Sequence, residues 1–246
     1  MNIAKLLFHI AKQDGVEFVI KSGTAFSYPM HSHFNVYMVT VVRSGTLRLV
    51  RRDSMEICPA GSTYIIPPYE PHRASADDGF DTVSLCINKN KFHHLERSLL
   101  TAKALEYAQI LMEQSVLSAE TVQNLLVGID EIYEEFISVE KAPTVTLDTL
   151  KSWAHADMEN VSMIPADLSP FQFIRKVKSE IGITPHQYLL QLRIRKAKQL
   201  IESGMPIADA ALSAGFYDQS HLNRLFSQRL GITPRMYQNS FFNLSS

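Results

Sequence analysis

Three histidines in the first third of the chain have the type and spacing of a ligand site. His31 and His33 are separated by one residue, so on a β-strand both imidazoles would point to the same face. His72 follows the proline-rich run 67–71 and could supply a third nitrogen ligand for zinc, iron, nickel or manganese. Alternatively, the histidines are packed side chains or hydrogen-bonding groups of a pocket for an organic molecule.

Tyrosines in the same part of the chain favour the organic molecule. The predicted ligand-binding residues are Tyr28, His31, His33, Tyr37, Tyr64 and His72. Their hydroxyl and imidazole groups suit a small molecule that carries polar groups. No paired acid and base accompanies the histidines in the sequence, which argues against an enzyme.

A second set of candidate residues lies in a stretch that occurs twice. Arg175–Tyr188 and Arg224–Tyr237 share arginine, glycine, threonine, proline and tyrosine residues at a constant offset of 49 positions. Two copies are too few for a solenoid, which needs at least three. We therefore interpret them as two copies of one small helical unit.

The second copy predicts a helix-turn-helix. Pro206–Ala214 is typical of a short helix, Gly215 allows a sharp turn, and Asp218 can cap a second helix over Gln219–Leu230 that Gly231 ends. In this arrangement the second helix enters the major groove of DNA. Its candidate DNA-binding residues are Gln219, Ser220, His221, Asn223 and Arg224. The equivalent helix of the first copy, Pro170–Ile181 capped by Ser169, offers Phe171, Gln172, Arg175 and Lys176.

Charge and helix length agree with a nucleic-acid partner. From Leu168 to the end, ten Lys and Arg residues stand against four Asp and Glu, although the whole chain has a net charge of −1. A basic module on an acidic remainder indicates a polyanionic partner. A helix over Pro185–Ser203 would span about 28 Å, close to the ~34 Å between successive major-groove faces. The alternative is two packed helical hairpins in which Arg175 and Arg224 make only surface ion pairs.

The elements that would position these residues predict an α+β protein of two domains. Residues 16–90 read as short strands between turns, typical of a barrel or sandwich. The predicted strands are Val16–Ile20, Tyr37–Val42, Leu47–Val50, Tyr64–Ile66 and Thr82–Ile87. Two appended helices, His94–Val116 and Ala119–Ser138, would cover the barrel or contact a second subunit. The expected domains are a barrel over 1–90, a helix pair over 91–140 and, after a linker at Glu140–Pro143, an all-α domain over 141–246.

Composition places the chain among globular proteins. The hydrophobic fraction of 46% is normal for a protein with a packed core. The two cysteines lie in apolar runs and predict no disulfide framework. The N-terminal run Ile3–Ile10 is too short and too charged for a signal peptide or a membrane span. We expect a cytoplasmic protein without membrane contact.

The repeated region resembles a known family. The segment Gly215–Phe226, followed by Leu230–Pro234, resembles the signature of the AraC/XylS transcription regulators, and the likeness extends back to Leu168. The resemblance implies two helix-turn-helix units joined by a long helix. The positions that it implies to face bases are Phe171, Ile174, Arg175, Ser220, Asn223 and Arg224. The segment 153–167, with Pro165, departs from the family's first scaffold helix, and Val177 stands where an aromatic residue is usual. We expect the second copy to carry more of the hydrogen-bonded readout and the first to add Arg175 and apolar contacts.

The histidine region resembles the cupins. Gly61, Pro67 and His72 resemble the second cupin motif, and His31 and His33 resemble the first. Metal-binding cupins carry a glutamate four or five residues after the second histidine, where this chain has Tyr37 and Met38. We therefore predict no cofactor, with a divalent metal at His31, His33 and His72 as the alternative.

These resemblances imply a transcriptional regulator rather than an enzyme. Its expected partners are a double-stranded DNA operator, a small-molecule effector in the barrel, RNA polymerase and a second copy of the chain. Two alternatives stay open: a metal-dependent cupin enzyme, and a ligand-independent regulator whose barrel only dimerises. The effector, the operator, and the choice between activation and repression are left open by the sequence.

Overall fold

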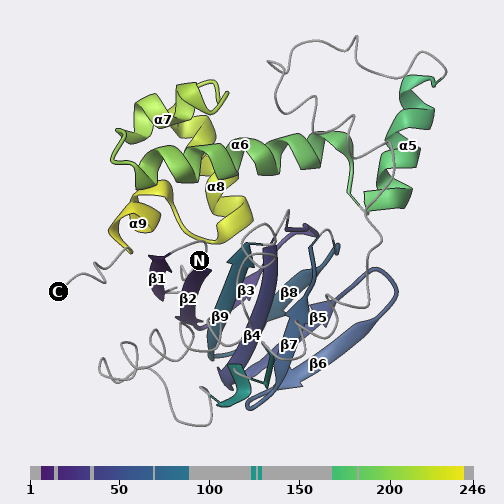
Figure 1. The fold of residues 1–246 in the computed structure, drawn as a ribbon, viewed down its shortest axis with the longest axis vertical. Coiled ribbons are helices and arrows are strands. Elements are labelled where there is room, and N and C mark those ends of the chain that lie inside the picture. The colour runs from purple at the N-terminus through teal and green to yellow at the C-terminus, as the bar shows by residue number, and fades with distance from the viewer. Residues whose placement is uncertain are drawn as a thin grey trace. The chain divides into compact units, whose positions relative to one another are not determined.

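A computed structural model describes residues 7–13, 16–33, 36–68, 70–88, 123–125, 127–128, 168–181 and 183–240. The chain divides into two compact units, one of which holds the strands and the other the helices from Pro170 onward. The α+β class with two dissimilar domains is confirmed (Figure 1). The predicted linker, the segment 153–167 and most of the predicted helix pair lie outside the described residues, so the predicted domain bounds stay a prediction.

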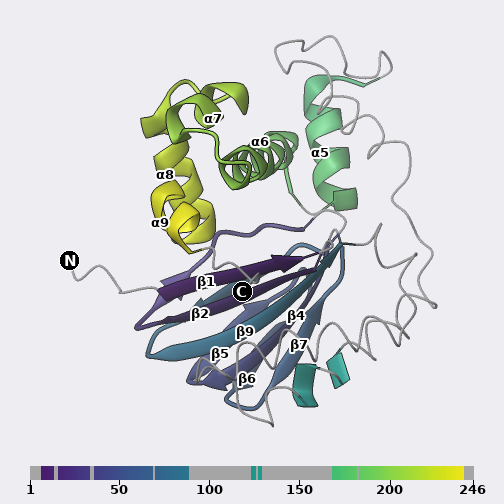
Figure 2. The same cartoon turned by 60° about the vertical axis from the view of Figure 1, so that its left-hand side comes forward.

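The strands form two antiparallel sheets (Figure 2). One sheet has the order β1-β2-β9-β4-β7 and the other has the order β3-β8-β5-β6. Their bounds are β1 Leu7–Gln13, β2 Val16–Gly23, β3 Phe26–Ser27, β4 Val36–Ser44, β5 Thr46–Val50, β6 Met55–Pro59, β7 Thr63–Ile66, β8 Arg73–Ala76 and β9 Phe80–Asn88. The cupin-like double-sheet architecture agrees with the prediction, but within the described residues no strand pairing closes the two sheets into a barrel.

Four of these strands were not predicted from the sequence: β1, β3, β6 and β8. Strand β8 has the sequence Arg-Ala-Ser-Ala, which carries no strand signal of its own. It is extended because it pairs with β5 on one side and β3 on the other. Such non-local pairing outweighs intrinsic β-propensity.

The central strand β4 is buried on both faces. Val39, Thr40, Val41 and Val42 are all buried, although successive side chains of a strand point to opposite faces. The other sheet covers one of these faces. Phe80 in β9, the neighbour of β4, packs its ring against Phe26 in β3 of the other sheet, with the ring centroids 4.6 Å apart. We call the space between the sheets the interior and the opposite side of β4 the outer face.

A helical turn covers the outer face of β4. Residues 123–125 and 127–128 are helical, within the predicted helix Ala119–Ser138. A Cβ atom on Gly128 would lie 2.3 Å from Cγ1 of Val39 and 3.3 Å from Cγ2 of Thr63. Asn124 also donates from Nδ2 to the carbonyl oxygen of Gly61 at 3.4 Å. The helix therefore packs its backbone directly on β4 and β7.

The helical unit contains α5 (Pro170–Ile181), α6 (Pro185–Glu202), α7 (Ile207–Ser213), α8 (Gln219–Leu230) and α9 (Pro234–Asn239). The predicted bounds of α5 and α8 are confirmed, and those of α6 and α7 differ by one residue at the ends. Helix α9 was not predicted. Among the described residues, no helix has the length and apolar composition that crossing a membrane requires.

The repeat is a packing repeat. Helices α5 and α8 occupy equivalent positions at the offset of 49 residues, and their inward residues Phe173 and Leu222 are both buried. The Ile-Thr-Pro segment after each helix has a constant role, because Thr184 caps α6 and Thr233 Oγ1 accepts the backbone N–H of Met236 at 3.1 Å in α9. In each copy the shared threonine thus caps the helix that follows: α6 after α5, and α9 after α8.

Candidate nucleic-acid interface and interior polar site

Helix α8 is positioned by the turn that precedes it. Oδ1 of Asp218 accepts the backbone N–H of His221 at 2.7 Å and caps the first turn. Gly215 has a φ of +83°, and a Cβ atom there would lie 3.2 Å from Nε of Arg193 in α6. Glycine therefore suits both the left-handed turn and its close approach to α6. Leu222 and Phe226 are buried.

The opposite side of α8 carries the predicted DNA-binding residues. Gln219, Ser220 and Arg224 are exposed, and Asn223 is half-buried. His221 differs from them, because its Nδ1 accepts the backbone N–H of Tyr217 at 3.3 Å. Its ring also packs edge-on against Phe216, with the centroids 5.6 Å apart. His221 therefore holds the start of the helix.

Helix α5 presents a similar face with different chemistry. It begins with a capping box, in which Oγ of Ser169 accepts the N–H of Gln172 at 3.3 Å and Oε1 of Gln172 accepts the N–H of Ser169 at 2.8 Å. Phe173 and Val177 are buried on the inner side. The predicted residues Phe171, Ile174, Arg175 and Lys176 are exposed.

The ion pairs that the structure describes all lie among the strands and their loops. Within the described residues, Arg175, Lys176 and Arg224 take part in none of them. The alternative in which Arg175 and Arg224 serve as surface ion-pair partners therefore has no support in these residues. Exposed cations on α5 and α8 that form no ion pair within the described residues suit contacts with phosphates and bases.

The structure brings the three predicted histidines together. One nitrogen each from His31, His33 and His72 lies within 4.8 Å of the others. The rings of His33 and His72 have centroids 4.9 Å apart. These residues therefore form one cluster, the histidine cluster, as the sequence predicted.

Backbone carbonyls orient two rings of the histidine cluster. Nδ1 of His31 lies 2.9 Å from the carbonyl oxygen of Pro29, and Nδ1 of His72 lies 3.0 Å from that of Glu70. A carbonyl oxygen can only accept, so each Nδ1 carries the hydrogen, and in the neutral form of each ring the lone pair lies on Nε2. A carbonyl partner on the remote nitrogen is the usual support of a metal-binding histidine. The cluster therefore fits a three-nitrogen ligand set, without the cupin glutamate.

Burial keeps His72 neutral. Desolvation, together with the positive charges of Arg51 and Lys21, lowers the pKa of His72 to about 4, although the hydrogen bond to the Glu70 backbone raises it. At neutral pH the ring is therefore uncharged. An uncharged imidazole is the form that binds a metal ion or accepts a hydrogen bond from a ligand.

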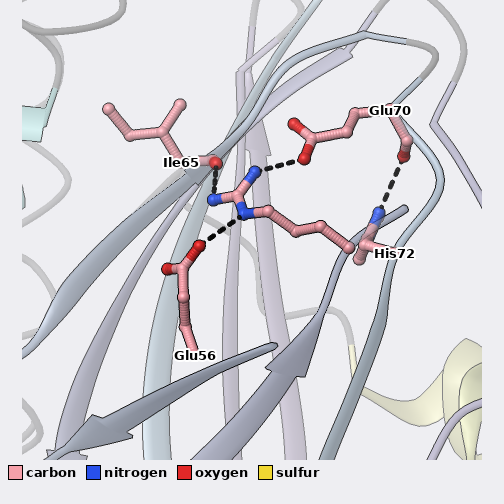
Figure 3. A network of polar contacts seen from close by, with 5 residues as sticks. Glu56, Ile65, Glu70 and His72 are labelled. Carbon is pink, nitrogen blue, oxygen red and sulfur yellow. Dashed lines mark hydrogen bonds and ion pairs between the residues drawn. The ribbon is translucent and has the colours of Figure 1, made fainter. Parts of the chain in front are cut away.

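Arg51 fixes the segment that carries His72. Its Nε donates to Oε1 of Glu56 at 3.0 Å, its Nη2 donates to the carbonyl oxygen of Ile65 at 2.8 Å, and its Nη1 binds the carboxylate of Glu70 (Figure 3). Glu70 in turn offers its carbonyl oxygen to His72. The guanidinium thus links β6, β7 and the loop before β8. Arg51 was not predicted as a site residue, because its partners are up to 19 residues away in the sequence.

Buried hydroxyl groups line the interior beside the cluster. Oγ1 of Thr40 and Oγ of Ser84 are 2.8 Å apart, and Thr40 also hydrogen-bonds Tyr64, whose pKa is raised by burial. Nζ of Lys21 donates to the hydroxyl of Tyr28 at 3.1 Å and lies 4.5 Å from the centre of its ring. Lys21, Thr40 and Ser84 were not predicted as site residues. The sequence feature that could have identified them is a polar side chain inside an otherwise apolar strand.

Tyr37 does not belong to this interior. In the register of β4, Thr40 pairs with Tyr64 and Ser84, whereas Tyr37 pairs with Ile87. Because side chains alternate along a strand, Tyr37 lies with Val39 on the outer face. The prediction that Tyr37 and Tyr64 line one pocket is therefore wrong.

Comparison with family models matches both units. Residues 165–240 match a helix-turn-helix domain, and residues 15–140 match the AraC-like ligand binding domain. The chain is 34% identical over 149 residues to the probable transcriptional regulator LumQ of Photobacterium leiognathi, a match that covers 57% of each protein. It is 27% identical over 231 residues to the HTH-type transcriptional regulator YbfI of Bacillus subtilis, covering 81% of this chain and 83% of YbfI.

Among solved structures, the whole chain resembles ToxT from Vibrio cholerae. The TM-score is 0.56 at 10% identity, and the match covers 93% of this chain and 98% of ToxT. A ToxT structure with a bound unsaturated fatty acid gives the same TM-score at 14% identity, covering 96% of this chain and all of that chain. This likeness shows the two-unit fold.

Proposed function

Because the chain belongs to the AraC family of transcriptional regulators, with a ligand-binding domain and a helix-turn-helix DNA-binding domain, we propose that a small organic effector bound in the interior controls how tightly α5 and α8 hold an operator. The observation that carries this proposal is the pair of equivalent, exposed helix faces, each with an arginine at the same place: Arg175 and Arg224.

In the proposed complex, α5 and α8 would make different kinds of contact with DNA. In α8, Ser220, Asn223 and Arg224 would hydrogen-bond to base edges, with Gln219 beside them; Arg224 suits a bidentate contact with guanine. In α5, Arg175 and Lys176 would meet phosphates or bases. Gln172 and His221, which the sequence also predicts as DNA-binding residues, would instead act by holding the helix starts.

The effector would be recognised by hydrogen bonds. Tyr28, Tyr64 and His72 offer hydroxyl and imidazole groups in the interior, and Lys21 and Thr40 add to them. Such a lining suits a small molecule with several polar groups. The ToxT structure with a fatty acid supports an organic ligand in this fold. Control of DNA binding requires that the effector favour one state of the chain over another.

A metal ion at the histidine cluster is the second candidate for the interior. The carbonyl-bound Nδ1 atoms of His31 and His72 favour it, because they leave the Nε2 atoms as ligands. Bound zinc would supply a Lewis-acidic contact for a polar effector. Dialysis against zinc followed by elemental analysis tests this, with His31→Ala as the matched variant. Equal zinc content of the two proteins would exclude the site.

We also propose the remaining partners and the cellular place. A homodimer would double the operator contacts, RNA polymerase is the machinery that a transcriptional regulator acts on, and DNA binding supports a cytoplasmic location. The relatives are transcriptional regulators, which supports the absence of catalysis. If the protein turned over a substrate and a chelator abolished that activity, the enzyme alternative would be supported again.

The test of the proposed function begins with DNA selection. The full-length chain is used to select operators from a random duplex library, and small polar molecules are screened by thermal shift. A molecule that raises the melting temperature binds the folded state. We expect such a molecule to change the operator affinity at least several-fold. Selection without any enriched sequence, or thermal shifts without an effect on affinity, would contradict the proposal.

A further inference from the structure

Helix α5 exposes two large apolar side chains where α8 exposes polar ones. Phe171 is 79% exposed and Ile174 is 43% exposed. At the offset of 49 residues their equivalents are Ser220 and Asn223. Both apolar residues lie in the first turns of α5, on the same face as Arg175, because residues three and four apart are neighbours on a helix. On the face directed away from the core, α5 is therefore apolar at two positions where α8 is polar.

Packing of the helical unit does not account for Phe171 and Ile174. The core contacts of α5 come from Phe173 and Val177, which are 2% and 0% exposed. Phe173 and Val177 match the buried Leu222 and Phe226 of α8, so the inner face of α5 is already complete. A single exposed apolar residue is ordinary on a protein surface. Two such residues beside an arginine, at the positions that α8 uses for polar groups, indicate a binding role.

The major groove of DNA offers one apolar feature at the base edges. Adenine, guanine and cytosine present only hydrogen-bonding groups there, whereas thymine presents its C5 methyl group. The first residues of a recognition helix are the ones that reach base edges. Resting on the proposed DNA binding by α5, we propose that Phe171 and Ile174 read thymine methyl groups in the part of the operator that α5 contacts.

The spacing of the two side chains restricts the arrangement of the thymines. Residues at i and i+3 of a helix have Cβ atoms about 5–6 Å apart. Successive base pairs are about 3.4 Å apart along the axis. Phe171 and Ile174 therefore contact methyl groups one or two base steps apart, and Arg175 lies beside them over a neighbouring base or phosphate.

Replacing thymine by deoxyuridine tests the inference, because it removes only the methyl group. Operators selected with the full-length chain are resynthesised with deoxyuridine at one thymine at a time. Losing a buried methyl contact lowers affinity about fourfold. We expect such a loss at one or two thymines of the α5 half-site for the unaltered chain.

Variants assign the effect to the side chains. The Phe171→Ala variant should bind the thymine operator more weakly, and deoxyuridine at one of the two thymines should then cause no further loss of affinity. The Ile174→Ala variant should behave in the same way, with deoxyuridine at the other thymine causing no further loss. In the Ser220→Ala variant, the matched change in α8, deoxyuridine at either thymine should lower the operator affinity as much as it does for the unaltered chain. Since Phe171 and Ile174 are exposed, neither variant disturbs the core, and circular dichroism checks this.

Two results would overturn the inference while leaving the proposed function intact. One is specific operator binding in which no deoxyuridine substitution changes the affinity, or in which the selected half-site has no thymine. The other is full deoxyuridine sensitivity in the Phe171→Ala and Ile174→Ala variants. Absence of any specific operator would instead contradict the proposed function, so the two failures are distinguishable.

Discussion

Gln172 and His221 stand 49 positions apart, and each accepts a backbone N–H at the start of its helix. Gln172 accepts from Ser169 at 2.8 Å, and His221 accepts from Tyr217 at 3.3 Å. Two unlike side chains, an amide and an imidazole, thus have one role in the two copies. The position is used to hold the first turn, and the exposed positions before it, Phe171 and Ser220, stay available for the proposed contact with DNA.

Loss of either side chain should weaken the helix start without changing sequence preference. We expect Gln172→Ala and His221→Ala to lower the free energy of unfolding of the helical unit by about 0.5–1 kcal/mol, the usual cost of a lost cap interaction. Affinity for a specific operator and for random DNA should fall by the same factor. Urea unfolding and titration of both DNAs measure this. A selective loss of operator binding would make the residue a base contact.

Arg224→Ala should give the opposite pattern. Arg224 is exposed on α8 and takes part in no ion pair within the described residues. If it reads guanine, the variant loses about 1–3 kcal/mol of operator binding and much less binding to random DNA. Arg195→Ala removes an exposed charge from α6 and is the matched control. Equal losses on both DNAs would reduce Arg224 to a phosphate contact.

The helix-turn-helix was predictable because its signals are local. Gly215, Asp218 and Gly231 each determine a turn, a cap or an end within a few residues, and the structure places all three as expected. The interior polar site was only partly predictable. The side on which Tyr37 lies and the partners of Arg51 depend on strands that pair across long stretches of sequence. No local pattern contains that register.

Gly128→Ala should destabilise the strand unit. Its Cβ atom would meet Cγ1 of the fully buried Val39 at 2.3 Å, and overpacking of this kind costs about 1–3 kcal/mol. The change from glycine to alanine in a helix returns at most about 1 kcal/mol, so a net loss is expected. Val127→Ala, at a more exposed neighbouring position, should stay within about 0.5 kcal/mol. Thermal unfolding compares the two. A Gly128→Ala variant more stable than the unaltered chain would show that this helix does not pack on β4.

His72 should make the strand unit sensitive to mild acid. Its pKa is lowered from 6.5 to about 4 in the folded state, first by burial and then by Arg51 and Lys21. Between these values the unfolded chain binds a proton that the folded chain does not, so stability is complete above pH 6.5 and is lost as the pH falls toward 4. The loss from this residue amounts to about 3 kcal/mol at most.

The comparison that isolates this effect uses His72→Gln, which stays neutral throughout. Both proteins are unfolded by urea at several pH values between 4.5 and 7.5, with EDTA present so that no metal ion competes for the imidazole. We expect the stability of the unaltered chain to fall more steeply on acidification than that of the variant. Parallel curves would mean that His72 titrates at its ordinary pKa in the folded protein, and that it is charged when the interior meets an effector at mildly acidic pH.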